Sequence, residues 1–182
     1  MISKRLLAEV EERVLCHCAS KGYVSGPNWN PLHPQDCVSA LAMARCLVES
    51  GAFDHYIAVA PEGHVYGFFF EQLGVRLLSV AVDYPPTQVD SPADLSMLCG
   101  RRVLLVEDDV VSGLSLRLVI DEIARHGPSS VSLYLGREKS SQQLQNVPLE
   151  IERVYLAEDD LDPTYRNRYE SEFIDTFRDF AR

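Results

Sequence analysis

The stretch from Arg101 to Gly127 constrains the fold more than any other part of the chain. It opens with an unbroken apolar run, Val103 to Val106, which is typical of a parallel strand covered on both faces. Three acidic residues follow, then a Ser-Gly-Leu-Ser loop, then apolar residues at helical spacing. This order predicts one unit of an open α/β sheet, in which ligands bind at the carboxyl ends of the strands.

The periodicity elsewhere repeats this alternation of strands and helices. Further strands are predicted at residues 55–60, 75–82, 130–135 and 150–156. Helices are predicted at residues 2–21 with Ser3 as N-cap, 37–50 with Asp36 as N-cap, 65–73 and 164–182. Loops or turns are predicted at residues 22–35, 83–99 (with one helical turn after Ser91), 137–147 and 157–163. The sequence therefore predicts a single α/β domain over residues 1–182, with a parallel, Rossmann-like sheet and helices on both faces.

The charge of the chain excludes some partners. It has 27 Asp and Glu against 17 Lys and Arg, a formal net charge of −10. Nucleic-acid binding needs clustered basic residues, so no nucleic-acid partner is expected. The apolar runs are shorter than the ~20 residues of a membrane span, so no membrane partner is expected either. Five cysteines, an odd number, and an N-terminus without a secretion signal predict reduced thiols in the cytoplasm.

The loop Ser112–Ser115 has the residues of an anion site. It precedes a predicted helix, so backbone N–H groups and two hydroxyls meet at the positive end of the helix dipole. Glu107 and Asp108, beside it, would repel a bare phosphate but would accept hydrogen bonds from hydroxyls or hold Mg²⁺, directly or through water. A ribose 5-phosphate satisfies both requirements. A purely structural interpretation, in which the acids only complement the helix dipole, leaves the Ser-Gly-Leu-Ser pattern unexplained.

At these residues the sequence resembles the type I phosphoribosyltransferase family. The signature of that family is an apolar strand, two acidic residues, a short spacer, and then Thr or Ser, Gly, any residue, and Thr or Ser. Here Glu107 and Asp108 match the acidic pair, and Ser112, Gly113 and Ser115 match the loop, although Leu114 replaces a usual glycine. The resemblance implies that the acidic pair binds the ribose hydroxyls of phosphoribosyl pyrophosphate. It also implies that the loop binds the 5-phosphate through Val111, Ser112, Gly113, Leu114 and Ser115.

The resemblance extends upstream, where Tyr56 to Val82 is similar to the family's strand, pyrophosphate loop and helix. It implies a pyrophosphate loop formed by Pro61, Glu62, Gly63 and His64. It also implies a core at about residues 36–136, and a hood over the acceptor base formed by residues 1–35 and 137–182.

Further implications concern the reaction. Mg²⁺ would arrive with the diphosphate and meet Glu107 and Asp108, and Asp108 or Asp109 would act at the acceptor. The family resemblance also implies a homodimer. The acceptor base would stack on an aromatic residue, for which the candidates are Trp29, Tyr84 and Tyr134.

The chain departs from the family pattern where the pyrophosphate would bind. Glu62 places a negative charge there, residues 83–99 contain no Lys or Arg, and Arg101 and Arg102 are expected at the opposite end of the sheet because they open a strand. Two functions therefore stay open. One is transfer of a 5-phosphoribosyl group to a nucleobase-like acceptor with release of pyrophosphate. The alternative is a catalytically inactive member of the fold that senses a nucleotide, such as a nucleoside monophosphate, or binds a partner.

Overall fold

The structure is a computed structural model, and it describes residues 2–22, 34–82, 88–91, 94–137 and 141–181. The strands of these ranges are β1 (His55–Ala60), β2 (Leu77–Val82), β3 (Val89–Asp90), β4 (Arg102–Glu107), β5 (Ser130–Leu135) and β6 (Val154–Leu156). The α-helices are α1 (Lys4–Ser20), α2 (Pro34–Glu49), α3 (Gly63–Gln72), α4 (Leu114–Ala124), α5 (Ser141–Leu144), α6 (Ala157–Asp160) and α7 (Arg166–Phe177). Short 3₁₀ helices are η1 (Leu95–Leu98), η2 (Pro163–Tyr165) and η3 (Arg178–Ala181).

The strands form one six-stranded sheet in the order β3-β2-β1-β4-β5-β6. Every neighbouring pair is parallel except β2 with β3, which is antiparallel. The predicted parallel α/β sheet is therefore confirmed. The edge strand β3 was not predicted, because it lies within the stretch 83–99, for which the sequence predicts a loop. A strand of two residues is too short to give a periodic pattern in the sequence.

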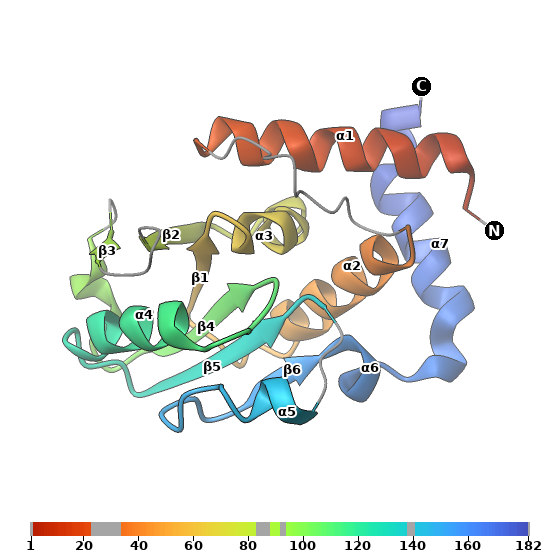
Figure 1. The fold of residues 1–182 in the computed structure, drawn as a ribbon. Coiled ribbons are helices and arrows are strands. Elements are labelled where there is room, and N and C mark those ends of the chain that lie inside the picture. Colours follow the sequence, from red (N-terminus) through yellow and green to blue (C-terminus); the bar gives the residue numbers. More distant parts are fainter. Residues whose placement is uncertain (1, 23–33, 83–87, 92–93, 138–140, 182) are drawn as a thin grey trace.

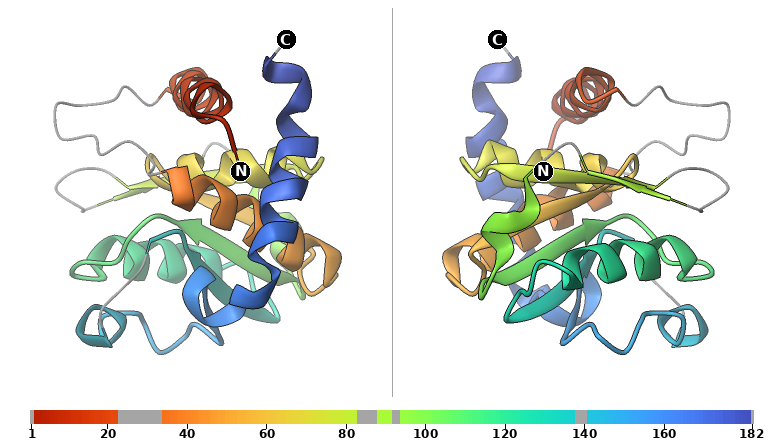
Figure 2. Two further views of the ribbon diagram at one scale, coloured as in Figure 1. Left: turned by 90° about the vertical axis from the view of Figure 1, so that its right-hand side faces the viewer. Right: turned by 90° about the vertical axis from the view of Figure 1, so that its left-hand side faces the viewer.

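Both faces of the sheet are covered, as an apolar strand such as β4 requires. Leu104 and Val106 of β4 belong to one hydrophobic core, together with residues of α1, α2, α3 and α7. Val103 and Leu105 belong to a second core on the other face, together with residues of α4 and η1. Figure 2 shows α4 on one side of the sheet and α1 on the opposite side.

The two ends of the chain meet in the layer above the first face. Helix α1 crosses α3 and contacts η3, while α7 packs along α2 (Figure 1). Ser3 caps α1 by accepting from the Leu6 N–H, as predicted. Phe173 and Phe177 of α7 are fully buried in this layer. The terminal segments are thus anchored to the core through α2 and α3, and α1 lies on the side of α3 that faces away from the sheet (Figure 2).

Several element boundaries differ from the sequence prediction. Helix α2 begins at Pro34, so Asp36 lies within its first turn and is not its N-cap; proline suits the first helical position because its missing N–H has no partner to lose there. The predicted strand 150–156 is reduced to β6, which pairs with β5 alone. The loop 137–147 contains α5, the turn 157–163 contains α6, and the predicted helix 164–182 is divided among η2, α7 and η3.

No helix in the described part of the chain is long and apolar enough to cross a membrane. All five cysteines are free in the structure. Cys18 and Cys37 are buried. Burial raises the pKa of Cys18 to about 11 and that of Cys37 to about 12, so neither is a reactive thiolate.

Candidate functional site

Three strands end at one edge of the sheet and bring the predicted site together. In the parallel register, Ala58 of β1 lies opposite Val106 of β4, and Glu107 of β4 lies opposite Leu135 of β5. The turn after β1, the acidic residues after β4 and the first residues after β5 therefore meet at this carboxyl edge. This is the edge at which ligands bind in open α/β sheets.

Gly63 holds the turn after β1 against β4. A Cβ atom at this position would lie 2.3 Å from the Val106 carbonyl oxygen, so only glycine allows this approach. Gly63 is also the first residue of α3, which therefore starts two residues earlier than the predicted helix 65–73. The close contact brings Glu62, which precedes α3, toward Asp108. Glu62 is exposed, yet partial desolvation raises the pKa of its carboxyl, and the Asp108 charge raises it further.

The two acids of the predicted pair differ in exposure. Glu107 is 9% exposed and turns back on the chain, where its Oε1 accepts a hydrogen bond from the Asp108 N–H at 2.9 Å. Burial raises the pKa of Glu107 well above its ordinary value, and the charges of Asp108 and Glu62 add to this effect. Asp108 is only half-buried. Asp108 is therefore the carboxylate of this pair that a ligand can reach more easily.

Arg137 is a cation of this edge that we did not single out in the sequence. Its Nε lies 3.8 Å from Asp108 Oδ2, and its backbone N–H donates to the Asp108 carbonyl oxygen at 3.1 Å. Its charge also lowers the pKa of Glu62. The one signal in the sequence is that Arg137 is the first basic residue after the predicted strand 130–135; that this strand lies beside β4 is known only from the structure. The charge of Arg137 partly offsets the negative charge of the acidic residues at this edge.

The predicted phosphate loop has an open outer side. Val111, Ser112, Leu114 and Ser115 are exposed, whereas Gly113 is buried. Gly113 precedes α4 in the left-handed conformation, with φ of 73°, and as a glycine it offers no side chain to cap the helix. The Ser112 hydroxyl accepts a hydrogen bond from the Leu114 N–H at 3.3 Å. The first turn of α4 therefore presents backbone donors to the solvent beside the acidic edge.

Asn146 supports this loop from the segment after α5. Its Nδ2 donates to the Val111 carbonyl oxygen at 2.6 Å. A Cβ atom on Gly113 would lie 2.0 Å from the Asn146 carbonyl oxygen. The glycine of the Ser-Gly-Leu-Ser pattern is thus required both by its backbone conformation and by the packing of Asn146. No sequence pattern around Asn146 indicates this contact.

His64 is part of the predicted pyrophosphate loop, but its side chain lies inside the protein. It is 3% exposed, and its Nε2 lies 3.0 Å from the Ser79 hydroxyl on β2. Its ring contacts that of His17 on α1, with 6.0 Å between the ring centroids. Burial, followed by the charges of His17 and Lys21, lowers the pKa of His64 to about 4. The imidazole therefore serves the packing of α1 on α3.

Tyr134 does not fit its predicted role as a platform for a base. It is 1% exposed in β5 and packs edge-to-face against Tyr66, with 6.1 Å between the ring centroids. The apolar, two-sided burial of the sheet interior leaves no room for a stacked ligand at this ring. The other two candidates, Trp29 and Tyr84, lie outside the described residues.

The donor set at this edge suits a magnesium ion that arrives with a ligand. Among the described residues, no group of three or more His, Cys, Asp or Glu side chains is arranged to hold a metal. Mg²⁺ is commonly bound through one or two carboxylates plus the phosphates of a substrate, and it keeps several waters. Half-buried Asp108 would provide one such carboxylate. Glu107, the other predicted metal-binding residue, is buried with its oxygen engaged by the Asp108 N–H.

Comparison of the fold with solved structures gives two informative matches. A purine phosphoribosyltransferase from Pyrococcus horikoshii matches over 68% of this chain and 82% of its own, with 20% identity and a TM-score of 0.52. A hypothetical protein from Neisseria gonorrhoeae with bound ppGpp matches over 77% of this chain and 93% of its own, with 18% identity and a TM-score of 0.51. No family model and no curated protein matches the sequence. The chain therefore has the α/β fold of the phosphoribosyltransferases.

Proposed function

We propose that this protein binds phosphoribosyl pyrophosphate at the carboxyl edge of the sheet and transfers its 5-phosphoribosyl group to a nucleobase-like acceptor. The observation that carries this proposal is that half-buried Asp108 and the exposed first turn of α4 flank one short turn, within the fold of the phosphoribosyltransferases. A ribose 5-phosphate needs hydrogen-bond acceptors for its hydroxyls and donors for its phosphate. This edge provides both on consecutive segments of one βα unit.

The roles of the residues follow from their exposure. Asp108 accepts hydrogen bonds from the ribose hydroxyls, and buried Glu107 positions it through the hydrogen bond that its carboxyl accepts from the Asp108 N–H. Backbone N–H groups at Ser112–Ser115 and the Ser115 hydroxyl receive the 5-phosphate. Asp109 is half-buried at the same edge and is the candidate base for the acceptor. The backbone of Pro61–Gly63 borders the pyrophosphate.

The charge at this edge decides how pyrophosphate can bind. A repulsion between two unit charges at ~4 Å is worth about 4 kcal/mol at an effective dielectric constant of ~20. Glu62 and Asp108 oppose a bare diphosphate in this way. Arg137 offsets part of this charge. Mg²⁺ bound to the diphosphate would neutralise more of it and stabilise the departing oxygens. The protein residues themselves contribute binding and orientation.

The transfer step balances without any other reactant. The bond from the anomeric carbon to the pyrophosphate oxygen breaks, and pyrophosphate leaves with the bonding electron pair. A ring nitrogen of the acceptor donates its lone pair to the anomeric carbon, and its proton passes to Asp109 or to solvent. The developing positive charge on the ribose ring is favoured beside the carboxylates of this edge.

The terminal segments extend this proposal to the acceptor. The carboxyl-terminal part of α1 reaches the turn after β1 through the contact of His17 with His64. Residues 1–35 and 137–182 are therefore proposed to form the hood over the base. We also propose a cytoplasmic homodimer as the working state, in line with the free thiols and the family resemblance.

The direct test is an assay of pyrophosphate release. The protein is incubated with Mg²⁺, phosphoribosyl pyrophosphate and each of a panel of purine, pyrimidine and pyridine bases. We expect release that depends on one class of base and is abolished in Ser115→Glu, because a carboxylate at this exposed position occupies the phosphate site. The matched control is Asp121→Asn on the exposed side of α4, which should keep full activity.

Two outcomes would contradict transfer. If no base supports pyrophosphate release but a nucleoside monophosphate raises the melting temperature, the site binds a nucleotide without catalysis. If Ser115→Glu retains the activity of the wild-type chain, the phosphate loop is wrongly assigned.

A further inference from the structure

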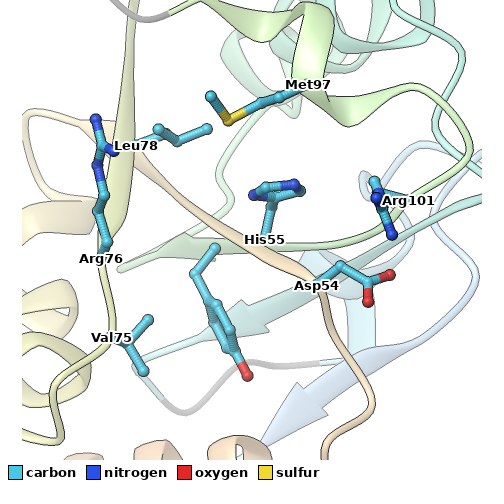
Figure 3. Close-up of a pocket in the computed structure, with 8 residues that line it drawn as sticks. Asp54, His55, Val75, Arg76, Leu78, Met97 and Arg101 are labelled. Carbon is cyan, nitrogen blue, oxygen red and sulfur yellow. The ribbon is translucent and has the colours of Figure 1, made fainter.

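A second concave site lies at the opposite, amino end of the sheet. A cavity of about 850 Å³ opens there between the start of β1, the start of β2 and η1 (Figure 3). It is lined by Asp54, His55, Tyr56, Val75, Arg76, Leu78, Met97 and Arg101. None of these residues belongs to the proposed phosphoribosyl site. The site at this end is therefore argued independently of the proposed function.

The cavity is basic although the chain as a whole is acidic. Arg76 and Arg101 stand on opposite sides of His55 (Figure 3). Among the described residues, neither guanidinium makes a hydrogen bond or an ion pair with an acidic side chain. In a protein with net charge −10, two such arginines facing one cavity are unusual. They form a local site for anions.

The one acid in the lining does not cancel this charge. Asp54 lies at the mouth of the cavity, where its Oδ1 is 3.2 Å from Nη2 of Arg102 and its Oδ2 accepts from the backbone N–H and the Nε of Arg102. These hydrogen bonds lower the pKa of Asp54 to about 2. Arg102 also donates to the Gly51 carbonyl oxygen. Asp54 thus makes its hydrogen bonds with Arg102, and the charge of Arg101 lowers its pKa only as the smallest of the causes. Arg76 and Arg101 keep their guanidinium donors for a ligand.

The rest of the lining is apolar and suits a ring. Val75, Leu78 and Met97 form part of the wall, and Met97 is 40% exposed although it is a large apolar residue. A thioether is polarisable and makes favourable contacts with aromatic rings. The imidazole of His55 stands between the two arginines (Figure 3). The cavity therefore combines an apolar wall with two arginine side chains.

We propose that this cavity binds a nucleoside that carries two or more phosphates. Its volume lies within the roughly 300–1,000 Å³ of typical small-molecule pockets. Guanidinium groups match the geometry of phosphate oxygens and form charge-assisted hydrogen bonds with them. Two phosphates engage Arg76 and Arg101, and the base lies against Met97 and Leu78. A nucleoside without phosphate lacks the charged contacts, and pyrophosphate alone lacks the apolar contact.

The test measures binding by calorimetry with ADP, adenosine and pyrophosphate as probes, in the Ser115→Glu background so that the carboxyl edge cannot take up phosphate. We expect saturable binding of ADP at one site per chain. Adenosine and pyrophosphate should each bind at least about tenfold more weakly, since one kind of contact is lost. The double variant Arg76→Ala/Arg101→Ala should abolish ADP binding.

A control with the same change in net charge separates local contacts from the overall charge. Arg5→Ala/Arg166→Ala removes two exposed arginines on α1 and α7, and should bind ADP like its parent. The proposal is overturned if ADP binds equally well after Arg76 and Arg101 are removed, or if no saturation occurs at millimolar ADP. Pyrophosphate binding as tight as that of ADP would overturn the assignment of a nucleoside. Because Ser115→Glu is present throughout, none of these outcomes depends on whether the protein is a transferase.

Discussion

The two ends of strands β1 and β4 carry carboxyl groups in opposite electrostatic states. At the carboxyl edge, burial raises the pKa of Glu107, and neighbouring acids raise it further. At the amino end, hydrogen bonds from Arg102 lower the pKa of Asp54 to about 2. Glu107 is thus held among acids, whereas Asp54 is satisfied by its own partner. A ligand at the carboxyl edge must therefore donate hydrogen bonds to these carboxyl groups or bring a cation. At the amino end, Arg76 and Arg101 provide positive charge for an anion.

Within the turn after β1, one residue faces the candidate site and another packs inside the protein. Glu62 and Asp108 are accessible and close enough to affect each other, whereas His64, two residues after Glu62, is buried against Ser79. A carboxyl group with a raised pKa at the carboxyl ends of parallel strands, such as that of Glu62, is typical of binding and catalytic sites. The perturbed His64 has a structural explanation. Accessibility distinguishes the two cases.

The largest effect is expected when Asp108, the more accessible acid of the carboxyl edge, is replaced by a neutral residue. Asp108→Asn should weaken binding of phosphoribosyl pyrophosphate with Mg²⁺ by about tenfold to a hundredfold, since hydrogen bonds to a charged group are worth about 1.5–3 kcal/mol. Glu62→Gln should have a much smaller effect, because Glu62 is assigned to no ribose hydroxyl. Isothermal calorimetry on both variants measures the difference. Equal, small effects would remove Asp108 from the site.

The buried histidine next to this edge should make stability depend on pH. The pKa of His64 is about 4 in the folded chain against 6.5 when unfolded, so the unfolded state binds the proton first as the pH falls. Stability is therefore lost between about pH 6.5 and 4, by up to about 3 kcal/mol from this group. His17, whose pKa burial also lowers, acts in the same direction.

Urea unfolding across this pH range tests the assignment. His64→Gln keeps a hydrogen-bonding group near Ser79 and should flatten the profile. A variant profile as steep as that of the wild-type chain would show that His64 is not the responsible group.

The close packing of the turn on β4 gives a third prediction. Gly63→Ala should lower the free energy of unfolding by about 1–3 kcal/mol, because the added Cβ would meet the rigid Val106 carbonyl oxygen at 2.3 Å. Gly67→Ala is the matched control in the same helix. Its Cβ would meet only the end of the Leu77 side chain, at 2.9 Å, and that side chain can move. Chemical denaturation should find Gly63→Ala clearly the more destabilised; the reverse order would contradict the packing described here.

The smallest predicted effect concerns the stability cost of the buried acid. Because the folded pKa of Glu107 is raised, its contribution to stability is present below its unfolded pKa and is lost as the pH rises through the folded value. Glu107→Gln removes this loss and retains an oxygen for the Asp108 N–H. It should therefore raise the free energy of unfolding near pH 8, and raise it by less near pH 5. Thermal unfolding at both pH values measures the change, and a variant less stable at pH 8 than the wild-type chain would refute it.

Much of the fold was predictable because it depends on local periodicity. The apolar runs gave β1 and β5 with their observed boundaries, and the acidic turn and serine loop fell at the end of β4 as expected. The predictions failed where the pattern was short or depended on contacts. Two-residue β3 leaves too little sequence for a period to be recognised, and of the strand predicted at residues 150–156 only Val154–Leu156 pairs with β5. Tyr134 is an aromatic residue and was a candidate platform for a base, but the structure shows that its ring is buried.

By itself, the sequence determined which residue types meet at the end of each strand, since strand direction and the order of segments follow from hydrophobic pattern and turn residues. It therefore determined the acidic pair and the serine loop of the Arg101–Gly127 unit. Only the tertiary structure decided which of these groups are accessible and which cations stand beside them. Arg137 beside Asp108, Asn146 behind Gly113, and Arg76 with Arg101 around one cavity all join residues that are distant in the chain. Such pairs are set by the lateral packing of strands and loops, and side-chain periodicity along one segment carries no information about its neighbours in space.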